Sequence, residues 1–249
     1  MRNPDGVRKQ ACPQGCICYE TEPTVSVIGD NLSRIRETID NTLHKTGRKD
    51  RVTLVVVTKT VPAERIMTAI DEGITIIGEN RVQEAAQKYE RIGNRVHWHM
   101  VGHLQRNKVK QAVQIFEMVQ SLDKVETAAE IEKRASSPMD VLIEINSSGE
   151  ETKSGVHPDA LFELIDGLLA FQKLRIRGLM TIGPFTDDER RIREAFALTR
   201  SRYEELGQRY QDLPIDTLSM GMSADYPLAI EEGSNMVRLG TALFGARQH

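Results

Sequence analysis

The fold is decided by the run Val52-Thr53-Leu54-Val55-Val56-Val57, which is nearly unbroken in apolar and β-branched residues. Such a run is typical of a strand buried on both faces, as in parallel sheets covered by helices. Upstream of it, apolar residues recur at steps of three and four, at Ile28, Leu32, Ile35, Ile39 and Leu43. This spacing predicts an amphipathic helix. A helix before a doubly buried strand indicates an α/β fold.

The alternation of strand and helix continues along the rest of the chain. Strand composition predicts seven further strands, at 74–77, 96–101, 115–122, 141–145, 174–182, 217–222 and 236–244. Helical spacing predicts segments at 62–70, 82–92, 108–113, 125–135, 161–169, 192–206 and 227–230. Eight such units fit a single-domain (β/α)8 TIM barrel and are too many for an ordinary doubly wound sheet. Because only 246–249 remain for a closing helix, we expect the helix at 28–43 to fill that gap.

The composition limits the classes of function. The chain has 249 residues, of which 28% are charged and 39% hydrophobic, as in one barrel-sized soluble domain or two small ones. A net charge of −3 offers no basic field for nucleic acid or an anionic membrane. No apolar run approaches the roughly 18 residues of a spanning helix, and residues 1–10 lack the apolar centre of a signal peptide. We therefore expect a cytoplasmic monomer that binds a small molecule, with no nucleic acid or membrane partner.

The cysteines Cys12, Cys16 and Cys18 all lie in the first twenty residues, where no helical or strand period is present. A metal site there would need a fourth ligand, and the nearest histidine, His44, lies inside a predicted helix. We expect residues 1–24 to form a disordered extension with ordinary thiols, while metal binding and redox sensing stay as minor alternatives. The barrel domain is assigned to 25–249.

Polar residues stand at the end of every predicted strand. The strands end in Thr58-Lys59-Thr60, Gly78-Glu79-Asn80-Arg81, Gly102-His103-Leu104-Gln105, Ser121-Leu122-Asp123, Asn146, Met180-Thr181, Met222-Ser223 and Arg238-Leu239-Gly240-Thr241. In a TIM barrel the active site forms at the C-terminal ends of the strands. This agreement predicts a ligand site at that end.

Lys59 closes an apolar strand, where scarce water disfavours its ammonium form and lowers its pKa. A neutral amine attacks a carbonyl and forms an imine, the chemistry shared by pyridoxal 5′-phosphate (PLP) sites and class I aldolases. The ordinary alternative is a lysine that extends to the barrel rim or pairs with a carboxylate. The position of Lys59 therefore leaves both uses open.

The C-terminal third of the chain predicts a phosphate site. Gly221-Met222-Ser223-Ala224-Asp225 follows the seventh strand, and Gly240-Thr241 lies on the eighth. Loops after strands seven and eight commonly bind phosphate in TIM barrels through backbone N–H groups. Since the eighth strand neighbours the first, a phosphate there would lie close to Lys59. The alternative is that these glycines only form turns.

Two further residues are candidates for contact with the ring of a bound cofactor. Arg238 alternates with Gly240 and is expected to face the ring or the phosphate, and beside a pyridine nitrogen it would discourage ring protonation. Asn80 offers amide donors and an acceptor to the ring hydroxyl or the aldehyde side. Either residue would equally serve as an ordinary rim residue.

Three histidines, His97, His99 and His103, lie around the third strand. His97 and His99 share one face of the strand, but no third ligand has a matching spacing, so we expect rim or core histidines and no metal.

Several stretches together resemble the pyridoxal phosphate homeostasis protein family, over about 28–245. They are Thr58-Lys59-Thr60, Gly78 to Glu84, Trp98-His99, Gly102 to Gln105, Asn107-Lys108, Lys153-Ser154-Gly155, Gly178 to Thr181, Leu218 to Asp225, Val237 to Thr241 and Phe244-Gly245. The resemblance implies a barrel of the alanine racemase N-terminal-domain type that holds PLP, a vitamin B6 cofactor, as a Schiff base on Lys59. It also implies phosphate contacts from Ser223, Gly240 and Thr241, a ring-nitrogen neighbour in Arg238 and a ring-side contact from Asn80.

The chain departs from the family pattern in three places. They are the cysteine-bearing extension before about Val25, Gly183 ahead of Pro184, and Asn235 where a threonine often follows Gly-Ser.

The resemblance implies a role in PLP homeostasis, in which the protein holds PLP and delivers it to PLP-dependent apoenzymes, with no catalytic residues of its own. The alternative is a PLP-dependent amino-acid racemase, which needs acid/base groups on both faces of the substrate Cα. In alanine racemase the second face is served by a tyrosine of another domain, and four residues follow Gly245 in this chain. We therefore favour the carrier, and an aldolase-like barrel that uses Lys59 without PLP stays as a third reading.

Overall fold

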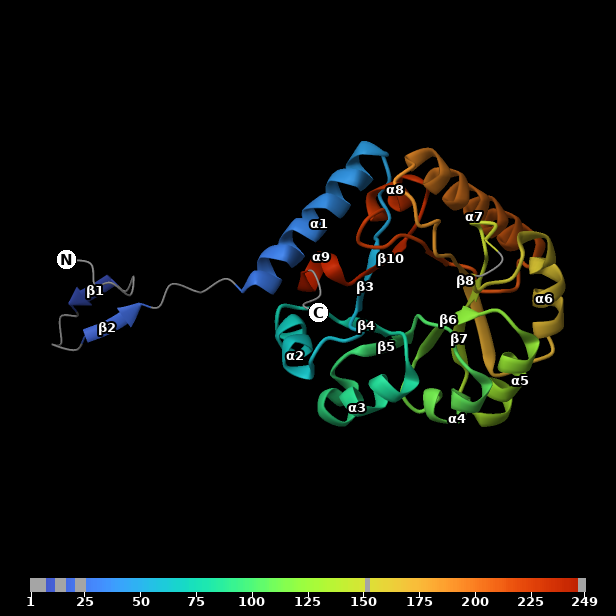
Figure 1. The fold of residues 1–249 in the computed structure, drawn as a ribbon, viewed down its shortest axis with the longest axis horizontal. Helices are drawn as coiled ribbons and strands as arrows, with labels where there is room; N and C mark the ends of the chain where they lie inside the picture. The colour runs from blue at the N-terminus through green and yellow to red at the C-terminus, as the bar shows by residue number, and fades with distance from the viewer. Residues whose placement is uncertain (1–7, 12–16, 21–25, 151–152, 246–249) are drawn as a thin grey trace.

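The structure is a closed barrel of eight parallel strands, in the order β10-β3-β4-β5-β6-β7-β8-β9 (Figure 1). The computed structural model describes residues 8–11, 17–20, 26–150 and 153–245. The barrel strands are β3 (Thr53–Val57), β4 (Ile76–Glu79), β5 (His97–Met100), β6 (Met118–Leu122), β7 (Met139–Glu144), β8 (Leu174–Met180), β9 (Thr217–Ser219) and β10 (Met236–Leu239). This confirms the TIM barrel predicted from the alternation of strands and helices.

Helices form the outer ring of the barrel (Figure 1). They are α1 (Val27–Lys45), α2 (Ala63–Asp71), α3 (Val82–Ile92), α4 (Val109–Ala112), α5 (Val125–Arg134), α6 (Leu161–Leu168), α7 (Glu189–Arg209), α8 (Tyr226–Glu231) and α9 (Thr241–Phe244). Short 3-10 turns occur at Gly93–Arg95, Arg106–Lys108 and Pro158–Ala160. No helix in the described ranges is long and apolar enough to cross a bilayer.

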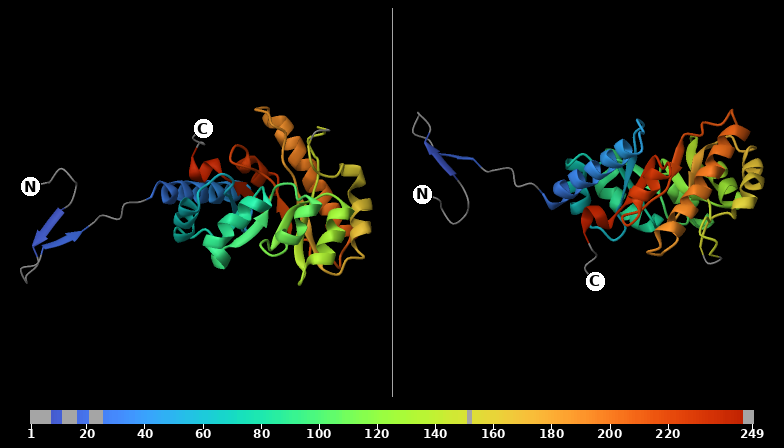
Figure 2. Two further views of the ribbon diagram at one scale, coloured as in Figure 1. Left: turned by 60° about the horizontal axis from the view of Figure 1, so that its bottom comes forward. Right: turned by 90° about the horizontal axis from the view of Figure 1, so that it is seen from above.

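The helix α1 fills the gap beside the last strand, as the sequence predicts. It packs against α8 and α9 and also meets α2. In both views of Figure 2 the blue helix runs beside the red C-terminal segment. The side chain of Ser26 caps α1 by accepting the N–H of Gly29 at 3.0 Å, and Asn31 Nδ2 donates to the carbonyl of Leu243 at 2.9 Å.

Two apolar cores hold the barrel together. The larger lies between strands and helices, where Val56, Ile77 and Phe196 are among the fully buried side chains. The smaller contains no helix residue and fills the inside of the barrel; its members are five strand residues and Val101, which directly follows β5: Val55, Val101, Met118, Leu142, Met180 and Met236. Every second residue of a strand points inward. An inward-facing residue two positions after a member of this layer therefore lies nearer the C-terminal mouth of the barrel.

Two predicted strands end three or more residues earlier than expected. The strand predicted at 236–244 stops at Leu239, and Thr241–Phe244 forms α9 instead, because the backbone turns at Gly240 (φ −119°, ψ −72°). The strand predicted at 217–222 stops at Ser219, shortly before Gly221 takes a φ of +92° that is open to glycine. At both places the chain therefore turns at the mouth of the barrel instead of continuing as a strand.

Within the first 25 residues the structure describes one antiparallel pair, β1 (Arg8–Ala11) with β2 (Ile17–Glu20). The sequence indicated no regular element there. Cys12 and Cys16 lie outside the described residues, and the disordered extension expected at 1–24 stays a prediction.

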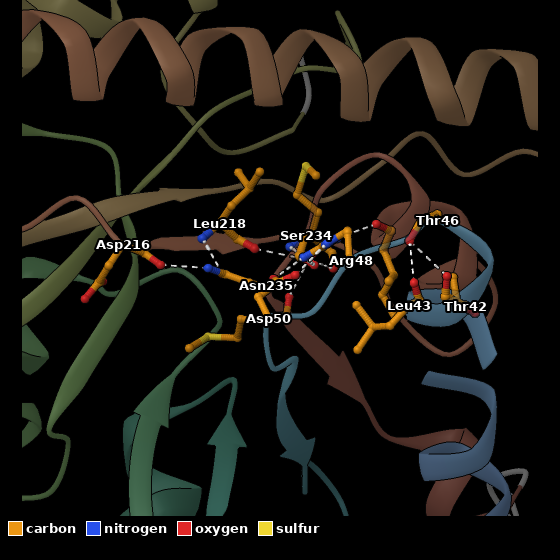
Figure 3. A network of polar contacts seen from close by, with 12 residues as sticks. Thr42, Leu43, Thr46, Arg48, Asp50, Asp216, Leu218, Ser234 and Asn235 are labelled. Atoms are coloured by element: carbon orange, nitrogen blue, oxygen red, sulfur yellow. Dashed lines mark hydrogen bonds and ion pairs between the residues drawn. The ribbon is translucent and has the colours of Figure 1, made fainter. Parts of the chain in front are cut away.

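A polar network ties the N-terminal ends of β9 and β10 together, and Figure 3 shows its members. Asn235 accepts the N–H of Leu218 at 2.8 Å and donates to the carbonyl of Asp216 at 2.7 Å. Nearby, Arg48 donates to the carbonyl of Ser234 at 3.0 Å. Since β9 and β10 share a single pair of register partners, the two bonds of the Asn235 amide add to the few backbone bonds that join these strands. This gives a physical reason for the asparagine at position 235.

Replacing Asn235 with alanine is expected to lower the free energy of unfolding by about 1 kcal/mol, because the partly buried N–H of Leu218 and the more exposed carbonyl of Asp216 both lose a partner. Urea denaturation measures the change. The control is Asn41→Ala on the exposed face of α1, which should change the stability little. Equal effects of the two substitutions would contradict this account of Asn235.

Candidate functional site

The predicted ligand residues gather at one end of the barrel, on four consecutive strands. Lys59 follows β3, Asn80 follows β4, Ser223 lies in the loop after β9, and Gly240 follows β10. The strand order β9-β10-β3-β4 makes these strands neighbours around the barrel. The amine of Lys59 and the glycine turn after β10 therefore leave adjacent strands, although they lie far apart in the sequence.

Ser223 fixes the turn that follows β10. Its Oγ accepts the N–H of Gly240 at 3.2 Å and the N–H of Ala242 at 3.1 Å. A Cβ at Gly240 would lie 3.1 Å from the carbonyl oxygen of Val57, so glycine lets the turn lie close to β3. Thr241 is exposed and begins α9. The loop after β9 and the turn after β10 thus form one unit.

Asn80 is half-buried, and its backbone lies against Gly102, in the segment that follows β5. A Cβ at Gly102 would be 2.5 Å from the carbonyl oxygen of Asn80, which no side chain could avoid without moving the backbone. Gly102 therefore permits the close approach that places Asn80 at the mouth.

Arg238 is only 4% exposed and starts a hydrogen-bonded chain across the barrel. Its Nη1 donates to Ser219 Oγ at 2.6 Å, and Ser219 donates to Gln120 Oε1 at 2.8 Å. The amide nitrogen of Gln120 lies 2.9 Å from His99 Nδ1. Since an amide nitrogen only donates, Nδ1 is the acceptor and the proton of His99 lies on Nε2. Burial lowers the pKa of His99 to about 4, so this imidazole is neutral.

The charge of Arg238 has no ion-pair partner among the described residues. Its Nη2 donates to the carbonyl of Thr181 at 2.7 Å. Burial lowers the pKa of Arg238 to about 10, while Glu144 and Asp225 act against that shift. The guanidinium therefore stays positive at neutral pH.

Glu144 is a mouth residue that the sequence analysis missed. It is 4% exposed and follows Leu142 of the inner layer by two residues, so it faces the same interior. Burial raises the pKa of Glu144 to about 7, helped by Asp123 and opposed by Arg238. The available signal was a carboxylate inside the strand predicted at 141–145, in step with inward-facing residues.

The three histidines around β5 have separate surroundings. His97 Nδ1 lies 2.6 Å from Glu117, His99 contacts Gln120, and His103 Nδ1 lies 3.9 Å from Asp123. In the part of the chain that the structure describes, no group of three or more histidine, cysteine, aspartate or glutamate side chains is arranged to hold a metal ion.

Known proteins are similar in sequence to this chain over most of its length. The family model described as "Alanine racemase, N-terminal domain" matches residues 31–248. A protein of Aquifex aeolicus named "Pyridoxal phosphate homeostasis protein" is 42% identical over 225 residues, 88% of this chain and 98% of that one. An Escherichia coli K12 protein with the same name is 37% identical over 238 residues, 89% of this chain and 97% of that one. The chain belongs to the pyridoxal phosphate homeostasis protein family.

Solved structures agree with membership of the pyridoxal phosphate homeostasis protein family. PipY of Synechococcus elongatus PCC7942 without PLP aligns with a TM-score of 0.80 at 33% identity, covering 88% of this chain and 100% of PipY. PipY with PLP bound aligns with a TM-score of 0.77 at 32% identity and the same coverage. An alanine racemase of Clostridium difficile 630 aligns with a TM-score of 0.67 at 17% identity, over 88% of this chain and 58% of that one, and shares the fold.

Replacing Glu144 with glutamine is expected to change the pH dependence of stability. The folded protein binds a proton on Glu144 that the unfolded chain releases between pH 4.5 and about 7, so wild-type stability from this group is present below 4.5 and lost as the pH rises to about 7. The loss amounts to roughly 3 kcal/mol for a shift of this size. The stability of Glu144→Gln relative to wild type should rise by that amount across the window, measured by urea denaturation at several pH values.

The titration of His99 changes the stability of the wild type with pH in the opposite direction, and so partly offsets the effect of Glu144. The depressed pKa of His99 gives stability that is present above 6.5 and lost as the pH falls to about 4. The comparison of variant with wild type removes this contribution. The control, Glu163→Gln on the exposed side of α6, should show no rise of that size, and the lack of such a rise for Glu144→Gln would contradict the assignment.

Proposed function

We propose that this protein holds PLP as a Schiff base on Lys59 and delivers it to PLP-dependent apoenzymes, without robust catalysis of its own. The observation that carries the proposal is the placement of a lysine amine and a Ser223-braced glycine turn on the adjacent strands β3 and β10. The names of the relatives and the PLP-bound PipY structure support the choice of PLP. A cytoplasmic location and a monomeric state remain predictions.

The phosphate end of PLP fits the chemistry of Ser223. A hydroxyl has two acceptor lone pairs and one donor hydrogen. Both acceptor directions of Ser223 are directed at the N–H groups of Gly240 and Ala242. The remaining O–H is therefore the group that would donate to a phosphate oxygen, together with the backbone of Gly240 and the hydroxyl of Thr241.

The ring of PLP fits beside Arg238. The guanidinium carries a charge at neutral pH, and next to a pyridine nitrogen it would keep that nitrogen unprotonated. An unprotonated ring is a weak electron sink, which suits a protein that holds the cofactor more than one that uses it to stabilise carbanions. Asn80, on the strand that follows Lys59 around the barrel, would meet the ring from the side.

The aldehyde of PLP supplies an electrophilic carbon to Lys59. In its unprotonated form Nζ would form a bond to that carbon, and the carbonyl oxygen would leave as water. Because addition of water or of another amine reverses this step, Lys59 would hold PLP covalently and still release it.

Lys59→Ala is expected to abolish the absorption band of a PLP imine and its reduction by borohydride, since it removes the amine that the proposal places beside the Gly240 turn. Absorbance after incubation with PLP, followed by mass spectrometry of the reduced protein, measures the linkage. Lys124→Ala, which removes an exposed lysine after β6, should leave the band unchanged. A wild-type protein without a reducible band, or Lys59→Ala with one, would overturn the proposal.

An amino-acid racemase is the second candidate, and Glu144 is the observation in its favour. A carboxyl group with a pKa of about 7 inside the mouth offers a proton donor or acceptor besides Lys59.

Chiral analysis tests this alternative with the PLP-loaded protein. Incubation with alanine or serine is expected to give no more racemisation than free PLP, and Glu144→Gln should not change that rate. Turnover well above free PLP that falls in Glu144→Gln would establish the racemase instead.

A further inference from the structure

A cluster of three buried side chains and one partly exposed carboxylate lies behind the turn that carries Lys59. We call it the Lys88 cluster; its members are Thr58, Glu79, Glu84 and Lys88, from β3, β4 and α3. Lys88 is 8% exposed, and its Nζ lies 2.6 Å from the carbonyl oxygen of Thr58, 2.6 Å from Glu79 Oε1 and 2.8 Å from Glu84 Oε1. An ammonium group has three donors, so each finds an acceptor here.

Glu79 forms the base of the cluster. It is fully buried, and its Oε1 accepts both Lys88 and the hydroxyl of Thr58 at 2.6 Å. Its Oε2 is buried without a hydrogen-bond partner among the described residues. Burial raises the pKa of Glu79, against the effect of Lys88. Because an unpartnered buried oxygen is costly, this arrangement is not the one that stability alone would favour.

Glu84 connects Lys88 to the far side of the Lys59 turn. Its Oε1 accepts the backbone N–H of Thr60 at 2.6 Å as well as the ammonium of Lys88. Thr60 has a φ of +64°, a conformation that β-branched residues rarely adopt. Such a conformation persists only where the surroundings enforce it, and here the contact with Glu84 does so.

Both neighbours of Lys59 are therefore held by one ammonium group. Thr58 is held directly through its carbonyl, and Thr60 is held through Glu84. We propose that Lys88 is a positioning residue: it holds the strained Thr58-Lys59-Thr60 turn so that the amine of Lys59 faces the aldehyde of a bound cofactor. This inference rests on the proposed function, because it assigns Lys88 a part in the same covalent step.

The cluster should affect bond formation more than ligand binding. Condensation depends on the placement of the amine within reach of the aldehyde carbon. The phosphate contacts come from the turns after β9 and β10, and the contacts of Lys88 are all with β3, β4 and α3. Loss of Lys88 should therefore weaken the imine while leaving phosphate and ring contacts in place.

The experiment compares PLP with 4′-deoxypyridoxine 5′-phosphate, which has the same ring and phosphate but a methyl group in place of the aldehyde. In Lys88→Met, we expect the equilibrium constant for imine formation to fall about tenfold or more, and the affinity for the deoxy compound to change by less than about twofold. Absorbance titration measures the first and calorimetry measures the second.

Two further variants serve as a control for the loss of a lysine and as a milder change to the Lys88 cluster. Lys133→Met removes an exposed lysine of α5 and should match wild type with both ligands. Glu84→Gln keeps an oxygen for the N–H of Thr60 but weakens the pairing with Lys88, so it should give a smaller loss of imine even if Lys88→Met does not fold.

The outcomes separate this inference from the proposed function. A wild-type protein that forms the imine, with variants that form it equally well or lose both ligands in parallel, would leave Lys88 a purely structural residue and overturn the inference. A wild-type protein that binds the deoxy compound but forms no imine would overturn the proposed function itself.

Discussion

The pairing of β10 with β3 is the constraint on which the site depends. Four register pairs, from Met236 with Thr53 to Leu239 with Val56, join the last strand to the first and close the barrel. This closure places the Gly240 turn beside the exit of the strand that carries Lys59. The packing of α1 on α8 and α9 covers the same seam from outside. A weakened pairing of β10 with β3 would therefore move the Gly240 turn away from Lys59.

The second feature of the mouth is a permanent positive charge that is buried without an ion pair among the described residues. Moving such a charge from water is costly unless fixed dipoles and hydrogen bonds replace the solvent. Arg238 obtains these from Ser219 and the carbonyl of Thr181, while Glu144 and Asp225 contribute at longer range. The mouth is thus organised around a guanidinium, and Glu144 helps to neutralise it when ionised.

The sequence was sufficient for the architecture because the barrel strands are short β-branched runs separated by amphipathic segments. It also indicated which strand ends meet, since closure makes the first and eighth strands neighbours. Glu144 was missed because a carboxylate inside a short strand resembles an outward-facing polar residue until the inward register is known. Lys88 was missed because, four residues after Glu84 on a helix, it resembles an exposed ion pair. Its burial depends on how closely α3 lies against the ends of β3 and β4, and no local pattern in the sequence carries that information.

The hydrogen-bonded chain from Arg238 to His99 also has a fixed polarity. A hydroxyl such as Ser219 can take up a proton and release another from the same atom, but the amide of Gln120 accepts on its oxygen and donates from its nitrogen. A proton on His99 therefore has no conducting route along this chain to the guanidinium. The chain therefore fixes the orientation of these side chains but does not transfer protons. The protonation state of His99 and that of Arg238 are not linked by proton movement along it.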